Sequence, residues 1–479
     1  MLFSSPVFIF LFLPIVVGIY LLLPSRIKNL FLVMTSLLFY AWGEKAIIMV
    51  LIVSTVADYL CALIIEKGYR KTGMALSLLT NLSLLGFFKY FNFAFENYKA
   101  LLDLLGFSHP GIMNVPYVAL PIGISFYTFQ TLSYTIDVYR GNIKANHNLI
   151  DYSAFVTMFP QLVAGPIVRY SDIHHQLRNK DISIQNFSLG LQRFIIGLAK
   201  KMIVANTFAE IADKTFSYAP SELSSALLWF GVLAYAIQLY YDFSGYSDMA
   251  IGMGHMLGFT FPENFNYPYI SKSIREMWQR WHITLSTWFK DYLYISLGGS
   301  RVSLPRVYVN LIIVFIITGL WHGAAWNFVI WGLANGAFII IEKAGFAKVL
   351  KKLGAPFQHF YTIMTWLITL VIFRSPDMGY AIDYYAQMFA FSKGNIPSVT
   401  YFSYFYLNTQ TLIMLVIGIT FCLPVYTLIE QKLNMIMNLN NTTHVMMSIF
   451  KIAFFVLILF VSASFLAADV YNPFIYFRF

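Results

Sequence analysis

Residues 5–23, SPVFIFLFLPIVVGIYLLL, form a run of 19 residues without a charged side chain. A helix needs about 20 apolar residues to cross the hydrocarbon core of a bilayer, so this run predicts a first membrane helix that stays in the mature protein. Several later runs are shorter than that length, and we expect these to be buried within the protein. Twelve further candidate spans follow, at 30–43, 46–65, 75–91, 118–138, 153–168, 189–206, 226–243, 308–320, 325–342, 359–373, 410–429 and 449–468.

Composition supports the same class of protein. Of the 479 residues 58% are hydrophobic and only 11% are charged, against roughly 25% charged in soluble domains. So few charges cannot cover a soluble globule, which excludes a soluble enzyme, a disordered chain and a fibrous repeat. Outer-membrane barrels show short alternating segments instead of continuous apolar runs. We therefore predict a single all-α, polytopic integral membrane domain spanning 1–479.

Charge and cysteine content narrow the possible partners. The net charge of +10 is attributed to basic cytoplasmic loops and not to nucleic-acid binding. Cys61 and Cys422 both lie in apolar runs, so neither a disulfide framework nor a cysteine metal site is expected. Basic residues alternate between the early loops, which places the N-terminus outside the cytoplasm. The loops assigned to the cytoplasm carry Arg26 and Lys28, then Lys67, Arg70 and Lys71, then Arg140 and Lys144, whereas those between them carry Lys45 and Lys99.

Polar residues cluster between 240 and 332, although polar side chains are costly at membrane depth. The first polar stretch runs from 241 to 265 and contains Asp242, Asp248, two serines and repeated glycines between apolar runs. It predicts either a broken helix that lines a cavity or an interfacial turn capped by Asp242 and Ser244.

The second polar stretch is 270–301, where an apolar stripe recurs every three or four residues. On that helical spacing Arg275, Gln279, His282 and Ser286 share another face. The alternative is an amphipathic helix at the membrane interface with tryptophan anchors. Residues 297–301 predict a tight turn. The stripe comprises Ile274, Trp278, Trp281, Leu285, Trp288 and Tyr292.

The third polar stretch is Trp321-His322-Gly323, which lies between apolar runs. A histidine at this depth is either neutral and hydrogen-bonded or exposed to a wet cavity. Gly323 allows a neighbouring helix or a substrate to approach closely. A packing histidine held between two helices is the competing interpretation.

These motifs together resemble the membrane-bound O-acyltransferase family, in particular its bacterial alginate O-acetyltransferase-like branch. The resemblance implies a ring of roughly 11–13 membrane helices around a thin core, with a funnel or tunnel to a buried histidine. His322 matches the catalytic histidine, and His282 matches a second polar site that is His, Asn or Asp in different members. Asp242, Asp248, Arg280 and Trp321 match motif positions without an assigned role. The motifs are 160–167, 241–265, 280–282, 291–295, 297–299, 321–323 and the ending 472–477.

The resemblance implies a reaction that histidine can catalyse without a metal or a bound cofactor. A neutral imidazole, with an unperturbed pKa of about 6.5, is suited to removing a proton from an acceptor hydroxyl. We expect His322 to be that base, and His282, or a water that it holds, to orient the acceptor or stabilise the oxyanion. Arg275, Arg280 and Lys290 are candidates for binding the phosphates of the donor, or else snorkel at the interface.

The expected enzyme lies among the lipids of the bacterial cytoplasmic membrane. It takes acetyl from acetyl-CoA in the cytosol and supplies it to an exported polysaccharide such as alginate, directly or through an extracytoplasmic acetyltransferase partner. Within the family the alternative is D-alanyl transfer to teichoic acid from a carrier protein. Other classes are a proton-coupled transporter, using Asp58 and Asp137 with the buried aspartates and histidines, and a scaffold for glycan export. Intramembrane proteolysis lacks its motifs.

Overall fold

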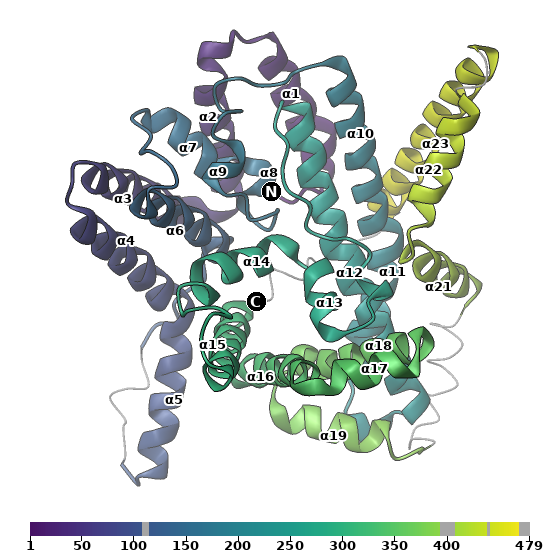
Figure 1. Cartoon of the computed structure of the whole chain (residues 1–479). Helices are drawn as coiled ribbons and strands as arrows, with labels where there is room; N and C mark the ends of the chain where they lie inside the picture. The colour runs from purple at the N-terminus through teal and green to yellow at the C-terminus, as the bar shows by residue number, and fades with distance from the viewer. Residues whose placement is uncertain (108–114, 393–407, 438–440, 469–479) are drawn as a thin grey trace.

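The computed structural model describes residues 1–107, 115–392, 408–437 and 441–468, and every regular element in those ranges is a helix (Figure 1). The ending 472–477 that carries part of the resemblance lies outside the described residues. The helices of the first half are α1 (Leu13–Leu22), α2 (Ser25–Glu44), α3 (Ile48–Glu66), α4 (Arg70–Leu85), α5 (Phe91–Leu104), α6 (Ile124–Arg140), α7 (Leu149–Thr157), α8 (Phe159–Leu162), α9 (Tyr170–Ile173), α10 (Ile184–Ala199) and α11 (Asn206–Thr215).

The second half begins with a long buried helix and continues through short central helices to the C-terminal spans. Figure 1 shows α13 and α14 near the middle of the view, with α12 beside α13 and α15 below α14. These helices are α12 (Ser225–Met256), α13 (Ile274–Arg280), α14 (Ile283–Trp288), α15 (Leu304–His322), α16 (Trp326–Ile341), α17 (Ala347–Leu353), α18 (Ala355–Arg374), α19 (Met378–Met388), α21 (Thr409–Phe421), α22 (Val425–Met437) and α23 (Asn441–Ala468).

The all-α, polytopic membrane fold is confirmed. Seven helical segments of the described chain are long and apolar enough to cross a membrane, and Phe8–Leu22 and Thr409–Phe421 are shorter apolar helices. The run 118–138 became α6, which has 17 residues and is buried along almost its whole length. Its burial was not expected from length, because the predicted run of 21 residues is long enough to span a bilayer. The seven long segments are Ser25–Glu66, Arg70–Leu104, Ser225–Met256, Leu304–His322, Trp326–Leu353, Ala355–Arg374 and Val445–Ala468.

Helix α12 contradicts both interpretations of the first polar stretch, because it runs unbroken from Ser225 to Met256. Its aspartates neither break the helix nor cap a turn. Asp242 forms a buried ion pair with Lys201, with 2.7 Å between Nζ and Oδ1. Asp248 lies 2.7 Å from Arg193 Nε and 2.6 Å from Lys200 Nζ. Cations from α10 and the π-helical turn after it (Lys200–Ala205) therefore neutralise the buried carboxylates.

The glycines of α12 have a packing role instead of a helix-breaking one. A Cβ on Gly245 would lie 2.7 Å from the carbonyl oxygen of Gly197, and one on Gly252 would lie 2.5 Å from that of Gly190. Real Cβ atoms do not approach backbone so closely. The absence of side chains at these four positions therefore lets α10 and α12 pack backbone to backbone.

The second polar stretch is not one helix, so the prediction of a continuous stripe with a shared polar face was wrong. Helix α13 ends at Arg280, and His282 adopts a left-handed conformation, with φ 45° and ψ 54°, before α14 begins. Residues 264–266 pair with the backbone at this break. Ile283 N donates to the carbonyl oxygen of Asn264 at 2.9 Å, and Asn266 N donates to that of Arg280 at 2.9 Å.

The apolar members of the predicted stripe are nevertheless all buried. The three tryptophans among them, Trp278, Trp281 and Trp288, lie in the protein core and not at an interface. The tight turn at 297–301 is confirmed, with positive φ angles of 101° at Gly298 and 57° at Gly299.

The helix packing generates a stability prediction. Gly197→Ala should lower the free energy of unfolding by about 1–3 kcal/mol, because its Cβ would meet the Gly245 carbonyl oxygen at 2.5 Å. Thermal unfolding in detergent micelles measures the effect. The control is Gly18→Ala on α1, where nothing lies within 4 Å of the new Cβ. Equal stability of the two variants would contradict the close packing of α10 and α12.

Candidate functional site

His322 is the last residue of α15, at a sharp turn into α16. Glycines allow these two helices to pack tightly, because a Cβ on Gly319 would lie 2.2 Å from the carbonyl oxygen of Phe328. A Cβ on Gly323 would lie 2.2 Å from the Phe328 ring. The predicted close approach at Gly323 is confirmed, and the neighbour is helix α16.

The His322 ring lies among aromatic side chains and beside a cavity. Ring centroids lie 5.0 Å away in Trp331 and 5.3 Å away in Phe373, both edge to face. The side chain is only 4% exposed, and its buried Nδ1 has no hydrogen-bond partner among the described residues. His322 lines a cavity of about 90 Å³, which is large enough to hold water. The structure therefore favours a cavity-facing histidine over one locked by hydrogen bonds between helices. Besides His322 the lining comprises Lys89, Leu120, Pro121, Ile122, Gly123, Ile124, Ser125, Phe126, Val163 and Trp321.

His282 is fully buried and tied to a hydrogen-bond hub on Asn264. Its Nδ1 lies 3.1 Å from Asn264 Oδ1, which also accepts from Thr284 N at 3.3 Å and Thr284 Oγ1 at 2.9 Å. Because a backbone N–H can only donate, that oxygen is the acceptor and His282 Nδ1 carries a hydrogen. Asn264 Nδ2 in turn donates to Ser247 Oγ on α12 at 3.1 Å.

Trp321 lies between the two histidines. Its ring centroid is 5.8 Å from that of His282 and 5.0 Å from that of His322, edge to face in both cases. Phe126 contacts Trp321 and His282 from the cavity side, at 5.3 and 6.4 Å. The structure thus brings together three of the predicted site residues, although His282 does not line the cavity itself.

The other predicted site residues lie elsewhere. Asp242 and Asp248 form the ion pairs that join α12 to α10 and the turn after it. Arg280 donates to Glu276 Oε1 at 2.9 Å and to the Asn266 carbonyl oxygen at 3.1 Å. Arg275 and Lys290 are exposed on α13 and on the π-helical turn Phe289–Tyr294. None of the five residues lines the cavity beside His322.

Sequence reasoning gave no role to Lys89 or Asn264. Lys89 lines the cavity, and its Nζ donates to the carbonyl oxygen of Trp321. The available signal was a single lysine inside the apolar run 75–91, which is costly at membrane depth and therefore a functional candidate. Asn264 lies within the motif 241–265, but only the folded chain shows which side chains it joins.

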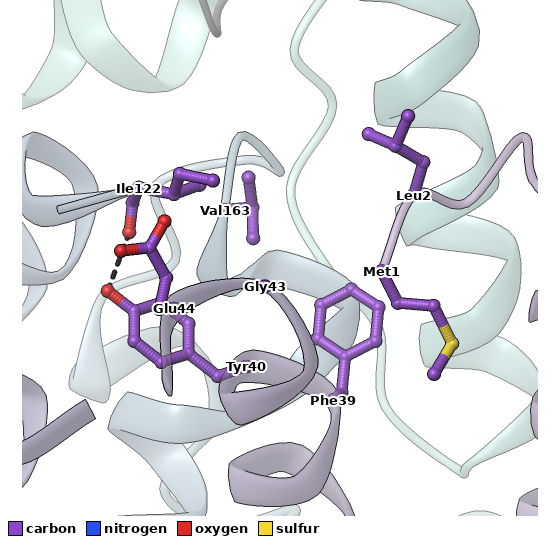
Figure 2. Close-up of a pocket in the computed structure, with 8 residues that line it drawn as sticks. All are labelled: Met1, Leu2, Phe39, Tyr40, Gly43, Glu44, Ile122 and Val163. Carbon is purple, nitrogen blue, oxygen red and sulfur yellow. Dashed lines mark hydrogen bonds between the residues drawn. The ribbon is translucent and has the colours of Figure 1, made fainter. Parts of the chain in front are cut away.

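A second hollow of about 160 Å³ adjoins the first, because Ile122 and Val163 line both. Figure 2 shows the carboxylate of Glu44 beside the hydroxyl of Tyr40, below Ile122 and Val163. Tyr40 donates to the carbonyl oxygen of Ile122 at 2.9 Å. The hollow beside Tyr40 and Glu44 and the cavity beside His322 are therefore neighbours that share a wall.

A third hollow of about 290 Å³ lies beside the Arg140 loop. Arg169 Nη1 meets Asp291 Oδ2 there at 2.9 Å, and Tyr292 donates to Asp137 at 2.8 Å. Across the part of the chain that the structure describes, no group of three His, Cys, Asp or Glu side chains is arranged to hold a metal ion.

Comparison with known proteins gives one consistent family. Residues 136–377 match the membrane-bound O-acyltransferase family. The chain is 44% identical over 404 residues to the probable alginate O-acetylase AlgI of Azotobacter vinelandii, covering 83% of this chain and 80% of that protein. It is 35% identical to the peptidoglycan O-acetyltransferase of Helicobacter pylori, covering 100% and 98%. The teichoic acid D-alanyltransferase of Bacillus subtilis is 29% identical, over 55% of this chain and 69% of its own length.

The backbone at position 282 generates the second prediction. His282→Val should lower the free energy of unfolding by about 1–3 kcal/mol, because a β-branched residue is strained at φ 45°. His282→Asn should cost less, since asparagine tolerates this conformation. Thermal unfolding checks both variants, with Ile283→Val in the right-handed first turn of α14 as control. A valine at 282 no more destabilising than asparagine would contradict the strained break.

Proposed function

Because this chain belongs to the membrane-bound O-acyltransferase family, we propose that it moves acetyl from cytosolic acetyl-CoA to a hydroxyl of an exported polysaccharide, directly or through an extracytoplasmic acetyltransferase partner. The chain is an O-acyltransferase and a multi-pass membrane protein. The observation that carries the proposal is His322 beside a cavity inside the protein. The similarity to two O-acetyltransferases of cell-surface glycans supports the choice of acetyl and of a polysaccharide acceptor.

In the proposed reaction His322 is the general base. The donor thioester is already activated, so the limiting requirement is to remove the proton of the acceptor hydroxyl as its oxygen attacks. The described residues offer Nδ1 of His322 no hydrogen-bond partner, and neutral imidazole has a basicity matched to this task. No step requires a metal or a bound cofactor.

His282 acts in this proposal through its neighbours. Its hydrogen-bonded ring packs on one side of Trp321, and His322 packs on the other. Since Trp321 precedes His322 in the chain, fixing the tryptophan also fixes the direction of the base. His282 is therefore proposed as a positioning residue, in addition to the predicted role of orienting the acceptor.

The hollows suggest separate routes for the two substrates. The loop charges assign the segment around Lys45 to the outside and the loop of Arg140 to the cytoplasm. We therefore propose that the acceptor enters past Tyr40 and Glu44, and that the donor approaches from the cytosolic side. Arg275, Arg280 and Lys290 remain candidates for contacts with its phosphates at the surface. The bacterial cytoplasmic membrane, with the N-terminus outside, fits this arrangement.

Two alternatives are less well supported. D-alanyl transfer to teichoic acid is supported by the similarity to the D-alanyltransferase of Bacillus subtilis, but that protein aligns with only 55% of the chain at 29% identity. A proton-coupled transporter needs a connected relay of carboxylates. Asp58 instead bonds to Asn81 and Thr135, and Asp137 bonds to Tyr292, so these two acids belong to separate local networks.

The base assignment has a direct test. His322→Ala should reduce acetylation of cell-surface polysaccharide by about 10²–10⁴-fold, since it removes the proton acceptor. Mass spectrometry of the glycan, normalised to the amount of folded protein in the membrane, measures the change. His147→Ala is the control, because His147 is exposed and pairs with Glu66 away from the cavity. Wild-type acetylation by His322→Ala would remove this residue from the mechanism.

The reaction class has a separate test. Proteoliposomes given acetyl-labelled acetyl-CoA on one side and acceptor polysaccharide on the other should accumulate labelled ester on the polysaccharide, with release of free thiol. A partner requirement would appear as label on the partner when the polysaccharide is omitted. Flux driven by a pH gradient, without any acylation of polysaccharide or partner, would instead establish the transporter.

A further inference from the structure

Lys89 is a buried cation whose bonded partners are neutral. It lies on the π-helical turn Gly86–Tyr90 between α4 and α5, and its side chain is only 8% exposed. No ion pair joins it to an acid in the part of the chain that the structure describes. A buried charge without a counter-ion is costly, and π-helical turns are common at functional sites.

Lys89 makes two hydrogen bonds within the protein and has a third N–H group. Its Nζ donates to the carbonyl oxygen of Trp321 and, at 3.1 Å, to Ser125 Oγ. It also lies 5.7 Å from the centroid of the Trp321 ring. An ammonium has three N–H bonds, so the third has no partner among the described residues. Lys89, Ser125, Trp321 and His322 all line the same cavity.

Lys201 shows how this fold treats a buried lysine with a structural role. It is 3% exposed, and its Nζ lies 2.7 Å from the carboxylate of Asp242. The carboxylate neutralises that charge and holds α12 against the turn after α10. Lys89 is also buried but has two neutral oxygens instead, and both belong to residues that line the cavity beside His322. Its remaining donor is therefore available to a substrate.

We propose that the Nζ–H of Lys89 stabilises the oxyanion that develops on the donor's thioester carbonyl during acyl transfer. The inference rests on the proposed function. Lys89 and His322 line one cavity, so the hydrogen-bond donor Lys89 and the base His322 can act on the same reacting group. Electrostatic stabilisation of this kind is strongest in a site shielded from bulk water.

In the proposed step one oxygen–carbon bond forms and one carbon–sulfur bond breaks. The acceptor hydroxyl oxygen forms a bond to the thioester carbonyl carbon, and its proton passes to His322. The carbonyl π electrons move onto oxygen, and the resulting negative charge accepts a hydrogen bond from Lys89. When the carbonyl re-forms, the carbon–sulfur bond breaks and the thiolate takes the proton from His322. The products are the acetyl ester and free thiol, with both residues restored.

The test uses the full-length protein in proteoliposomes with labelled acetyl-CoA. Lys89→Met keeps the length of the side chain and removes the donor, so kcat should fall by about 10²–10³-fold. The KM for acetyl-CoA should change little, because the lost interaction forms only in the transition state. Lys67→Met is the matched control, since Lys67 is exposed at the end of α3.

Chemical rescue separates this role from a purely structural one. Ethylamine added to Lys89→Ala should restore part of kcat, because the amine replaces the missing N–H donor in the cavity. The same amine should not restore His322→Ala. Rescue combined with an unchanged KM supports the proposal.

Three results would overturn the inference. These are a wild-type kcat in Lys89→Met, a rise in KM alone, or a kcat loss that follows loss of folded protein and resists rescue by ethylamine. A wild-type protein that forms no labelled ester would instead refute the proposed function itself. The two failures are therefore distinguishable.

Discussion

The oxygen of one buried amide, Asn264 Oδ1, determines how the centre of this protein is built. It accepts hydrogen bonds from the backbone and hydroxyl of Thr284 and from the ring of His282. In an interior with little water, losing any of these partners leaves a buried polar group unpaired, at a cost of about 1–3 kcal/mol. The chain breaks its helix at His282 to make all three bonds. That break places the imidazole beside Trp321, whose ring also contacts His322.

The same constraint explains why most polar residues in the membrane domain are structural and a few are not. Asp242 and Asp248 lie deep in α12, and each is matched by cations from the neighbouring helical layer. A charged group that is already paired in this way stabilises the fold but is not available to bind or react with a substrate. His322 and Lys89 differ, because each retains a nitrogen function that the described residues leave unpartnered and each lines the cavity. These two residues are therefore the ones to which we assign the proposed chemistry.

The left-handed backbone at position 282 gives a physical reason for part of the family resemblance. The resemblance places His, Asn or Asp at this position. These are also the non-glycine residues that most often adopt a positive φ. A side chain at 282 must both tolerate φ 45° and bond to the Asn264 hub. The requirement at this position is thus conformational as well as chemical.

The sequence by itself determined the all-α membrane fold and the family, because these depend on apolar run length and on motifs of residues adjacent in the chain, and it singled out His322 as a candidate. It also identified Ile274 to Tyr292 as a set of regularly spaced apolar residues, but not that their helix is broken or that all of them are buried. It did not determine whether α12 is continuous, since the cations that neutralise its aspartates come from about 40 to 55 positions earlier. Nor did it reveal the break at His282, which Asn264 and its neighbours impose, or Lys89, which reaches Trp321 across more than 200 residues. Only tertiary structure decides such features, because a buried polar group is defined by partners that local sequence does not contain.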